Sequence, residues 1–124
     1  MEPINEASIR RAKQTIRCLP FNENFYSITQ KKGLSAEVVM SRKIEYCSDG
    51  KKWFKRLIAV EKAFRYLIKI GILRREVDGQ GLTSKIRLTP LGRQIMEDNE
   101  MLLHQKPKKS ERIRHFFLYD LSLQ

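Results

Sequence analysis

The chain has 124 residues, which is enough for one ordinary hydrophobic core and small for two, so we expect a single domain over residues 1–124. Lysine and arginine outnumber aspartate and glutamate by 25 to 14, and the net charge of +11 favours a polyanionic partner. No apolar run reaches the length of a membrane span, and the N-terminus lacks the apolar region of a signal peptide. We therefore expect a cytoplasmic protein that does not contact membranes.

The residues that usually carry catalysis or hold metals are few and scattered. Cys18 and Cys47 form no CxxC motif, so the sequence indicates two reduced thiols and leaves a single disulfide open. His104 and His115 are isolated, without a paired carboxylate cluster, a phosphate-binding loop or a nucleophile motif. We predict no enzymatic activity, no metal and no cofactor.

The first half of the chain carries the signals of three helices. Asn5 can cap a first helix, about residues 5–19, that ends before a proline. Asn22 can cap a second, with Gly33 as its stop, and Ser35 a third that reaches about Ile44. Cys47 to Gly50 has the composition of a turn.

The next stretch, Lys51 to Ile70, is predicted to be one long basic helix. At about 100° per residue, five cations fall within roughly 80° of one another; they are Lys51, Lys55, Lys62, Arg65 and Lys69. An apolar set gathers on the opposite side: Phe54, Leu57, Phe64 and Ile68, flanked by Trp53, Val60 and Leu67. One face is therefore expected to pack on the core while the other meets phosphate.

A β-hairpin is predicted after Gly71, which stands where a helix end favours positive φ. Two short runs, residues 72–78 and 82–88, bracket the glycine-rich connection 79–81. Thr89 and Pro90 resemble an N-cap and a first helical residue, and the apolar face of that helix continues to about His104.

The C-terminal segment predicts an amphipathic helix, about residues 109–122, that needs another surface to cover it. Packing on the first helix of the same chain and contact with a second copy are both open. The residues expected to form this packing or homodimer surface are Ile9, Ile16, Ile113, Phe116, Phe117 and Leu121.

The positive charge is concentrated in one region. Between Lys51 and Arg93 the chain has twelve basic residues and three acidic ones, so nine of the eleven net charges lie there. A solvated helical face usually interleaves acids with bases, because neighbours of the same sign repel at this spacing. The imbalance indicates that a partner supplies the opposite charge.

Short helices, a turn, a long basic helix and a hairpin occur in the order of a winged helix-turn-helix. The predicted fold is mainly α with a small β-hairpin, with its core in about residues 21–96 and extra helices at both ends. We expect a DNA-binding protein, sequence-specific or structure-specific, that acts as a transcriptional regulator. The predicted DNA-binding residues are Lys51, Lys52, Lys55, Arg56, Lys62, Arg65, Arg74, Arg75, Gln80, Lys85 and Arg87.

From Gly71 to Arg75, and again from Ile86 to Arg93, the sequence resembles the wing of winged-helix transcription regulators, particularly the MarR-like group. These regulators commonly step from a glycine into a basic strand and return through a strand that ends in Leu-Thr-x-x-Gly-Arg. The resemblance implies double-stranded DNA as the partner and a homodimer matched to a twofold operator.

Two other functions fit the same pattern. A winged-helix module that binds RNA, or works in a nucleic-acid-processing complex, would carry the same basic surface. A protein-interaction subunit would use the aromatic residues Trp53, Phe116 and Phe117 in a docking surface.

Overall fold

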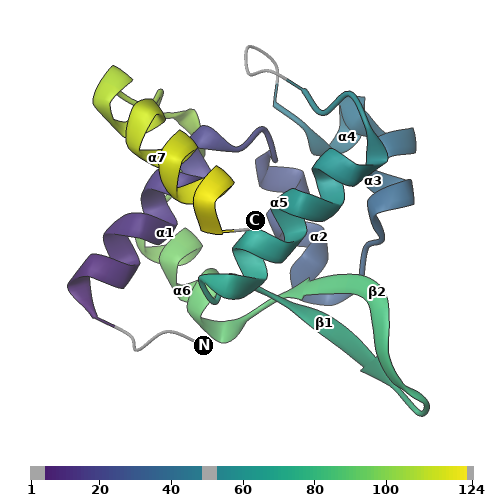
Figure 1. Cartoon of the computed structure of the whole chain (residues 1–124). Helices are drawn as coiled ribbons and strands as arrows, with labels where there is room; N and C mark the ends of the chain where they lie inside the picture. Colours follow the sequence, from purple (N-terminus) through teal and green to yellow (C-terminus); the bar gives the residue numbers. More distant parts are fainter. Residues whose placement is uncertain (1–4, 49–52, 123–124) are drawn as a thin grey trace.

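The structure is a computed structural model that describes residues 5–48 and 53–122, with side chains described through Tyr119. It is mainly helical with one two-stranded antiparallel hairpin, as predicted (Figure 1). Its elements are α1 (Glu6–Cys18), α2 (Glu23–Lys31), α3 (Ala36–Ser41), α4 (Lys43–Tyr46), α5 (Leu57–Lys69), β1 (Leu73–Asp78), β2 (Gly81–Leu88), α6 (Pro90–Asp98), the 3₁₀ turn η1 (Leu102–His104) and α7 (Lys109–Ser122).

The first three helices begin at the residues that the sequence predicted. The side chains of Asn5, Asn22 and Ser35 each accept a hydrogen bond from a backbone N–H three residues later, at 2.8, 2.9 and 3.2 Å. These bonds satisfy N–H groups that a helix leaves open at its start. The third helix is shorter than expected, because α3 ends at Ser41 and Ile44 lies exposed on the separate helix α4.

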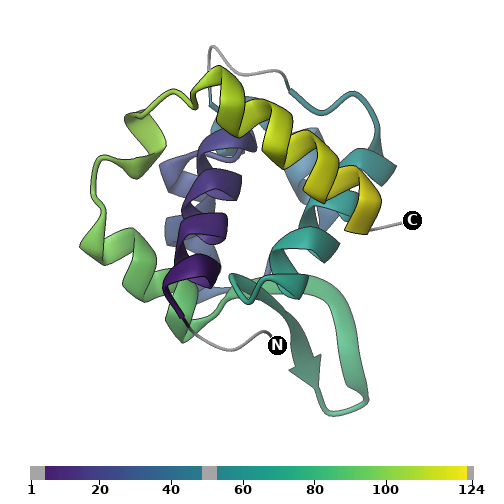
Figure 2. The same cartoon turned by 60° about the vertical axis from the view of Figure 1, so that its left-hand side comes forward.

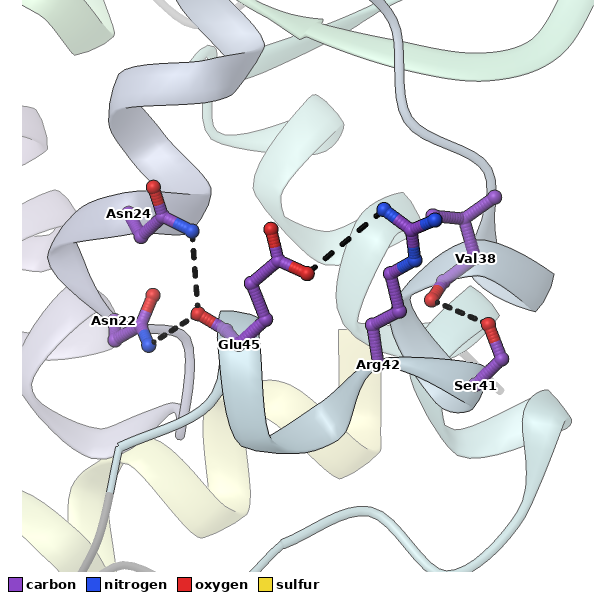
Figure 3. A network of polar contacts seen from close by, with 6 residues as sticks. All are labelled: Asn22, Asn24, Val38, Ser41, Arg42 and Glu45. Atoms are coloured by element: carbon purple, nitrogen blue, oxygen red, sulfur yellow. Dashed lines mark hydrogen bonds and ion pairs between the residues drawn. The ribbon is translucent and has the colours of Figure 1, made fainter.

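Helix α4 is tied to α2 by two asparagines (Figure 3). The amides of Asn22 and Asn24 donate to the Glu45 carbonyl at 2.9 and 3.3 Å, while the Glu45 carboxylate lies 3.8 Å from Arg42. After α4 the chain runs back beside α2, where Phe21 and Cys47 form a β-bridge. Neither Cys18 nor Cys47 forms a disulfide in the structure.

The predicted helix Lys51 to Ile70 is wrong in its first third, because α5 begins only at Leu57. Lys51 and Lys52 lie outside the described residues, and the chain from Trp53 to Arg56 is not helical. Phe54 is buried, with its ring centroid 5.1 Å from that of Phe21. The core therefore draws in an apolar side chain from a loop, which the periodicity of the sequence could not distinguish from a helix.

The core lies between α2 and α5. The rings of Phe21 and Phe25 stack at 4.1 Å, and Phe64 of α5 packs against both at 5.9 and 6.1 Å. All three side chains are fully buried. Such aromatic clusters contribute strongly to stability, because each ring removes a large apolar surface from water.

The hairpin is attached to this core through its base. Gly71 adopts the positive φ predicted for it, 88°, and β1 then pairs with β2 from Leu73↔Leu88 to Asp78↔Gly81. Leu34, in the α2–α3 connection, forms a two-bond bridge with Ile86 of β2, at 3.1 and 2.9 Å. The base of the hairpin is thus joined to a third extended segment.

Helix α6 starts as predicted, with Thr89 as N-cap and Pro90 as its first residue. The prediction that this helix reaches His104 is wrong: α6 ends at Asp98, and η1 follows after a short turn. The reason is a local cap, because the Asn99 side chain donates to the Ile95 carbonyl at 2.9 Å.

Helix α7 packs on α1 (Figure 2), and its residue Tyr119 contacts Lys62 and Tyr66 of α5. An ion pair between Arg17 of α1 and Glu111 of α7 joins the two terminal helices. The pKa of Glu111 is held below its usual value, chiefly by the hydrogen bond from the backbone N–H of Lys108. Burial acts in the opposite direction, and Arg17 adds to the lowering. None of the helices formed by the described residues is long and apolar enough to cross a membrane.

Candidate nucleic-acid interface

The outer face of α5 carries the basic residues that the sequence predicted for its second half. Arg65 and Lys69 are exposed and Lys62 is half-buried; we call these three residues the α5 stripe. Their spacing of three and four residues places them on one side of the helix. Ile58 begins the same side and is 67% exposed, which is unusual for an isoleucine. The apolar face opposite is buried through Val60, Phe64 and Leu67.

Helix α7 borders this stripe. The Lys62 ammonium lies 4.8 Å from the centroid of the Tyr119 ring, a cation–π contact. Tyr119 also packs edge-on against Tyr66 of α5 at 5.1 Å, and His115 stacks on Tyr119 at 5.0 Å. One of the three basic side chains is therefore partly covered by the chain's own C-terminal helix.

The basic residues predicted ahead of the stripe are not on the helix. Lys55 and Arg56 are exposed in the segment that leads into α5, and Lys51 and Lys52 lie outside the described residues. Helix α5 has no side-chain cap and no acidic residue in its first turn. A helix start with open N–H groups and nearby cations is a favourable environment for an anion.

The basic residues of the hairpin fall into two groups. Arg75 donates to the Ser84 carbonyl at 3.0 Å and pairs with Glu61 of α5 at 3.5 Å. Arg87 donates to the Gln30 carbonyl of α2 at 2.6 Å. These two arginines fix the hairpin between α5 and α2.

The other three predicted residues of the hairpin are exposed. Arg74 and Lys85 point away from the core, and Gln80 lies at the turn, where its N–H donates to the Asp78 carboxylate at 2.7 Å. Arg74 stands directly opposite Arg87 in the ladder. Like charges in that position repel, so a negative partner would stabilise the pair.

The residues predicted for packing or dimerisation fall into a group packed within the chain and a group exposed on α7. Ile16 is fully buried within the chain and Ile9 is half-buried, so both belong to the intramolecular packing of α1. Ile113, Phe116 and Phe117 are 58%, 61% and 57% exposed on α7. The side chain of Leu121 lies outside the described part of the chain.

Two residues that the sequence analysis overlooked organise this surface. Glu61 holds Arg75 against α5, and the Gln30 carbonyl receives Arg87. An acid inside a basic stripe is a signal that could have revealed Glu61. A backbone carbonyl carries no such signal in the sequence. Among the described residues, no group of histidine, cysteine, aspartate and glutamate could hold a metal ion.

Comparison with known proteins gives one match. Searches of curated proteins and of solved structures found nothing similar to this chain. A family model described as Npun_F0494-like matches residues 3–118, which is nearly the whole length. The chain therefore belongs to the Npun_F0494-like family.

Proposed function

We propose that this protein binds double-stranded DNA through α5 and the hairpin, and acts as a transcriptional regulator. The observation that carries the proposal is the α5 stripe: Lys62, Arg65 and Lys69 share one side of a helix whose opposite side is buried in the core. A rigid helix that presents aligned cations can follow a line of phosphates.

The order of the elements supports a winged helix-turn-helix as the architecture. Helix α2, the extended residue Leu34, helices α3 and α4, helix α5 and the hairpin follow one another as the parts of that motif do. In this arrangement α5 is the recognition helix and the hairpin is the wing. The long connection between α4 and α5 departs from the tight turn of a simple helix-turn-helix.

The MarR-like resemblance of the hairpin stays part of this proposal. It agrees with the additional helices α1, α6 and α7 around the central unit. It adds the expectation of a homodimer, for which the exposed residues Ile113, Phe116 and Phe117 would provide apolar contact area.

The experiment that tests the proposal is fluorescence anisotropy with a labelled duplex at several salt concentrations. If about six basic residues neutralise phosphates, log K against log salt falls with a slope of about −5. Replacing Arg65 and Lys69 together by glutamate is expected to abolish most of the binding, because it removes two cations and adds two anions to the α5 stripe. A slope near zero for the unaltered protein would refute the proposal.

Lys106→Glu provides the matched control. Lys106 is exposed in the connection between η1 and α7. This connection lies on the side of the molecule away from α5 (Figure 2). The control lowers the net charge in the same way as the stripe variant. A local interface predicts that only the stripe variant loses DNA binding, whereas a general charge effect predicts a loss in both. If the Lys106 variant and the Arg65/Lys69 double variant lost equal binding free energy for each charge reversed, a local interface would be refuted.

A protein-interaction subunit is the second candidate function, favoured by the apolar side chains exposed on α7. Replacing Phe116 and Phe117 by serine separates the two functions. A DNA-binding regulator keeps the affinity of its monomer for a half-site, whereas a docking subunit loses its partner and has no DNA affinity to keep. Competition between duplex DNA and double-stranded RNA in the same assay distinguishes the two nucleic acids.

A further inference from the structure

The first turn of α5 differs from the rest of its outer face. The α5 stripe is basic, but one turn before it the exposed side chains are aliphatic: Leu57 is 41% exposed and Ile58 67%. Ile58 precedes Lys62 by four residues and Arg65 by seven, so it lies on the same side of the helix as the stripe. An exposed isoleucine thus occupies the place where the basic face of α5 begins.

No side chain of this first turn can form a hydrogen bond. Residues 57–60 are leucine, isoleucine, alanine and valine. In the next turn the Glu61 carboxylate lies 3.5 Å from Arg75, and the Lys62 ammonium lies 4.8 Å from the centroid of the Tyr119 ring. The start of α5 therefore offers apolar contact to a partner, and the polar groups that follow it already have contacts within the chain.

With α5 as the recognition helix of the proposed DNA-binding unit, its first turn is the part that reaches the base edges. At 1.5 Å per residue, Arg65 and Lys69 lie roughly 10 and 16 Å farther along the helix axis than Ile58. The major groove is about 12 Å wide, so these two cations would reach its rim, where the phosphates are. The helix thus places cations at the DNA backbone and aliphatic side chains at the bases.

An aliphatic side chain can distinguish base pairs in the major groove in one way. The base edges there carry hydrogen-bond donors and acceptors, and thymine alone adds an apolar group, its C5-methyl. A polar edge placed against Ile58 would lose hydration without gaining a hydrogen bond, whereas a thymine methyl group would be removed from water. Contact with this methyl group accounts for an isoleucine that is exposed in the protein alone.

We propose that Ile58 determines sequence specificity by packing on the C5-methyl group of a thymine in the major groove, with Leu57 beside it. This role depends on the proposed binding of DNA by α5, and it adds the base that α5 recognises. Cations on both sides of Ile58, Arg56 before it and Arg65 after it, favour DNA over an apolar protein surface as the occupant. An apolar surface would leave these cations without an opposite charge.

Replacement of single thymines by deoxyuridine tests this role, because it removes only the methyl group and keeps base pairing. A duplex that the full chain binds tightly is first selected from a random pool, and versions with one uracil each are compared by fluorescence anisotropy. We expect binding to weaken about fourfold at one or two thymines, as the burial of one methyl group predicts. Ile58→Ala should weaken binding to the thymine duplex by about fourfold or more.

A double-mutant cycle then assigns the methyl group to Ile58. In the Ile58→Ala variant, deoxyuridine at the same thymine should cause no further loss of binding. Leu82→Ala is the matched control, because it shortens a similarly exposed aliphatic side chain at the tip of the hairpin, and it should leave the fourfold effect of uracil unchanged. Both positions are exposed, so the melting temperatures of the two variants should stay close to that of the unaltered protein.

The outcomes separate the role of Ile58 from the function of α5. Salt-dependent binding without a preferred sequence, or without an effect of uracil at any thymine, would overturn the role of Ile58 and leave the proposed function in place. A uracil effect that persists in the Ile58→Ala variant would do the same. If no duplex is bound at all, the proposed function fails, and the role of Ile58 fails with it.

Discussion

At its root the hairpin buries Ile86, which is fully enclosed and bridged to Leu34, whereas at its tip Leu82 is 76% exposed on the same strand. The arginines show the same contrast, because Arg87 at the root donates to the backbone of α2 while Arg74 is exposed. So do the threonines: Thr89 at the root donates to the Gly71 carbonyl at the end of α5, whereas Thr83 forms hydrogen bonds only within the hairpin. The comparison teaches that residue type does not fix the role of a side chain here. The root stabilises the fold, and the exposed arm is available for a partner.

The largest difference is expected between the two apolar residues of β2. Ile86→Ala should lower the free energy of unfolding by about 2–5 kcal/mol, because it leaves a cavity where the hairpin meets the core. Leu82→Ala should change it by less than about 0.5 kcal/mol, as is usual for an exposed position. Urea denaturation measures both, and similar losses for the two variants would contradict the distinction between root and tip.

The paired arginines of the ladder should separate stability from binding. Arg87→Ala removes the bond to the Gln30 carbonyl and is expected to cost about 1–2 kcal/mol of stability. Arg74→Ala should leave stability nearly unchanged but reduce the magnitude of the salt slope of DNA binding by about 1. Thermal melting and anisotropy on the same preparations test this. If the Arg74 variant were destabilised but bound DNA normally, Arg74 would be a structural residue and the predicted role in binding would be wrong.

Two threonines extend the comparison to polar groups. The Thr89 hydroxyl accepts from the Gly92 N–H at 3.0 Å and lies 2.5 Å from the Gly71 carbonyl oxygen, so it caps α6 and ties it to the end of α5. Thr89→Ala should cost about 1–2 kcal/mol of stability. Thr83→Ala loses the bond to the Glu76 carbonyl, at 2.9 Å, and a longer one from the Lys85 N–H, at 3.2 Å. Both lie within the exposed arm, so the substitution should cost no more than about half as much. The denaturant midpoints of the two variants show which substitution is more destabilising. A larger loss of stability in the Thr83 variant would contradict the prediction.

The last comparison concerns the two glycines of the turn. Gly81 has a φ of 118°, so Gly81→Ala should cost about 1 kcal/mol through backbone strain. Gly79 has neither a positive φ nor a neighbour within 4 Å of an added methyl group, and Gly79→Ala should be neutral or slightly stabilising. Thermal melting distinguishes these outcomes. Equal effects would mean that the turn adjusts freely to either substitution.

Much of the fold was predictable because its signals are local. Asn5, Asn22, Ser35 and Thr89 each cap a helix with a side chain that reaches only three residues along the chain. Gly71 likewise marks the end of α5 through its own backbone angle. Signals of this kind depend on few neighbours, so they can be recognised without knowledge of the tertiary structure.

The candidate interface was predictable only in part. Arg65 and Lys69 share the outer face of α5 because the helical period fixes which residues lie on one side. The sequence could not show that Arg75 has a structural role while Arg74 is exposed. That difference arises because Glu61 of α5 lies 3.5 Å from Arg75 across the α5–β1 contact. Nor could it reveal that Tyr119, more than fifty residues away, covers part of Lys62.

By itself, the sequence determined which segments become helix or hairpin and where most of them begin, because caps, turns and periodicity act over a few residues. The tertiary structure decided where α5 starts and which arginines hold the hairpin. Those outcomes depend on contacts between residues far apart in the chain. Phe54 is the clearest case: the core buries it from a loop, although its spacing fits a helix equally well.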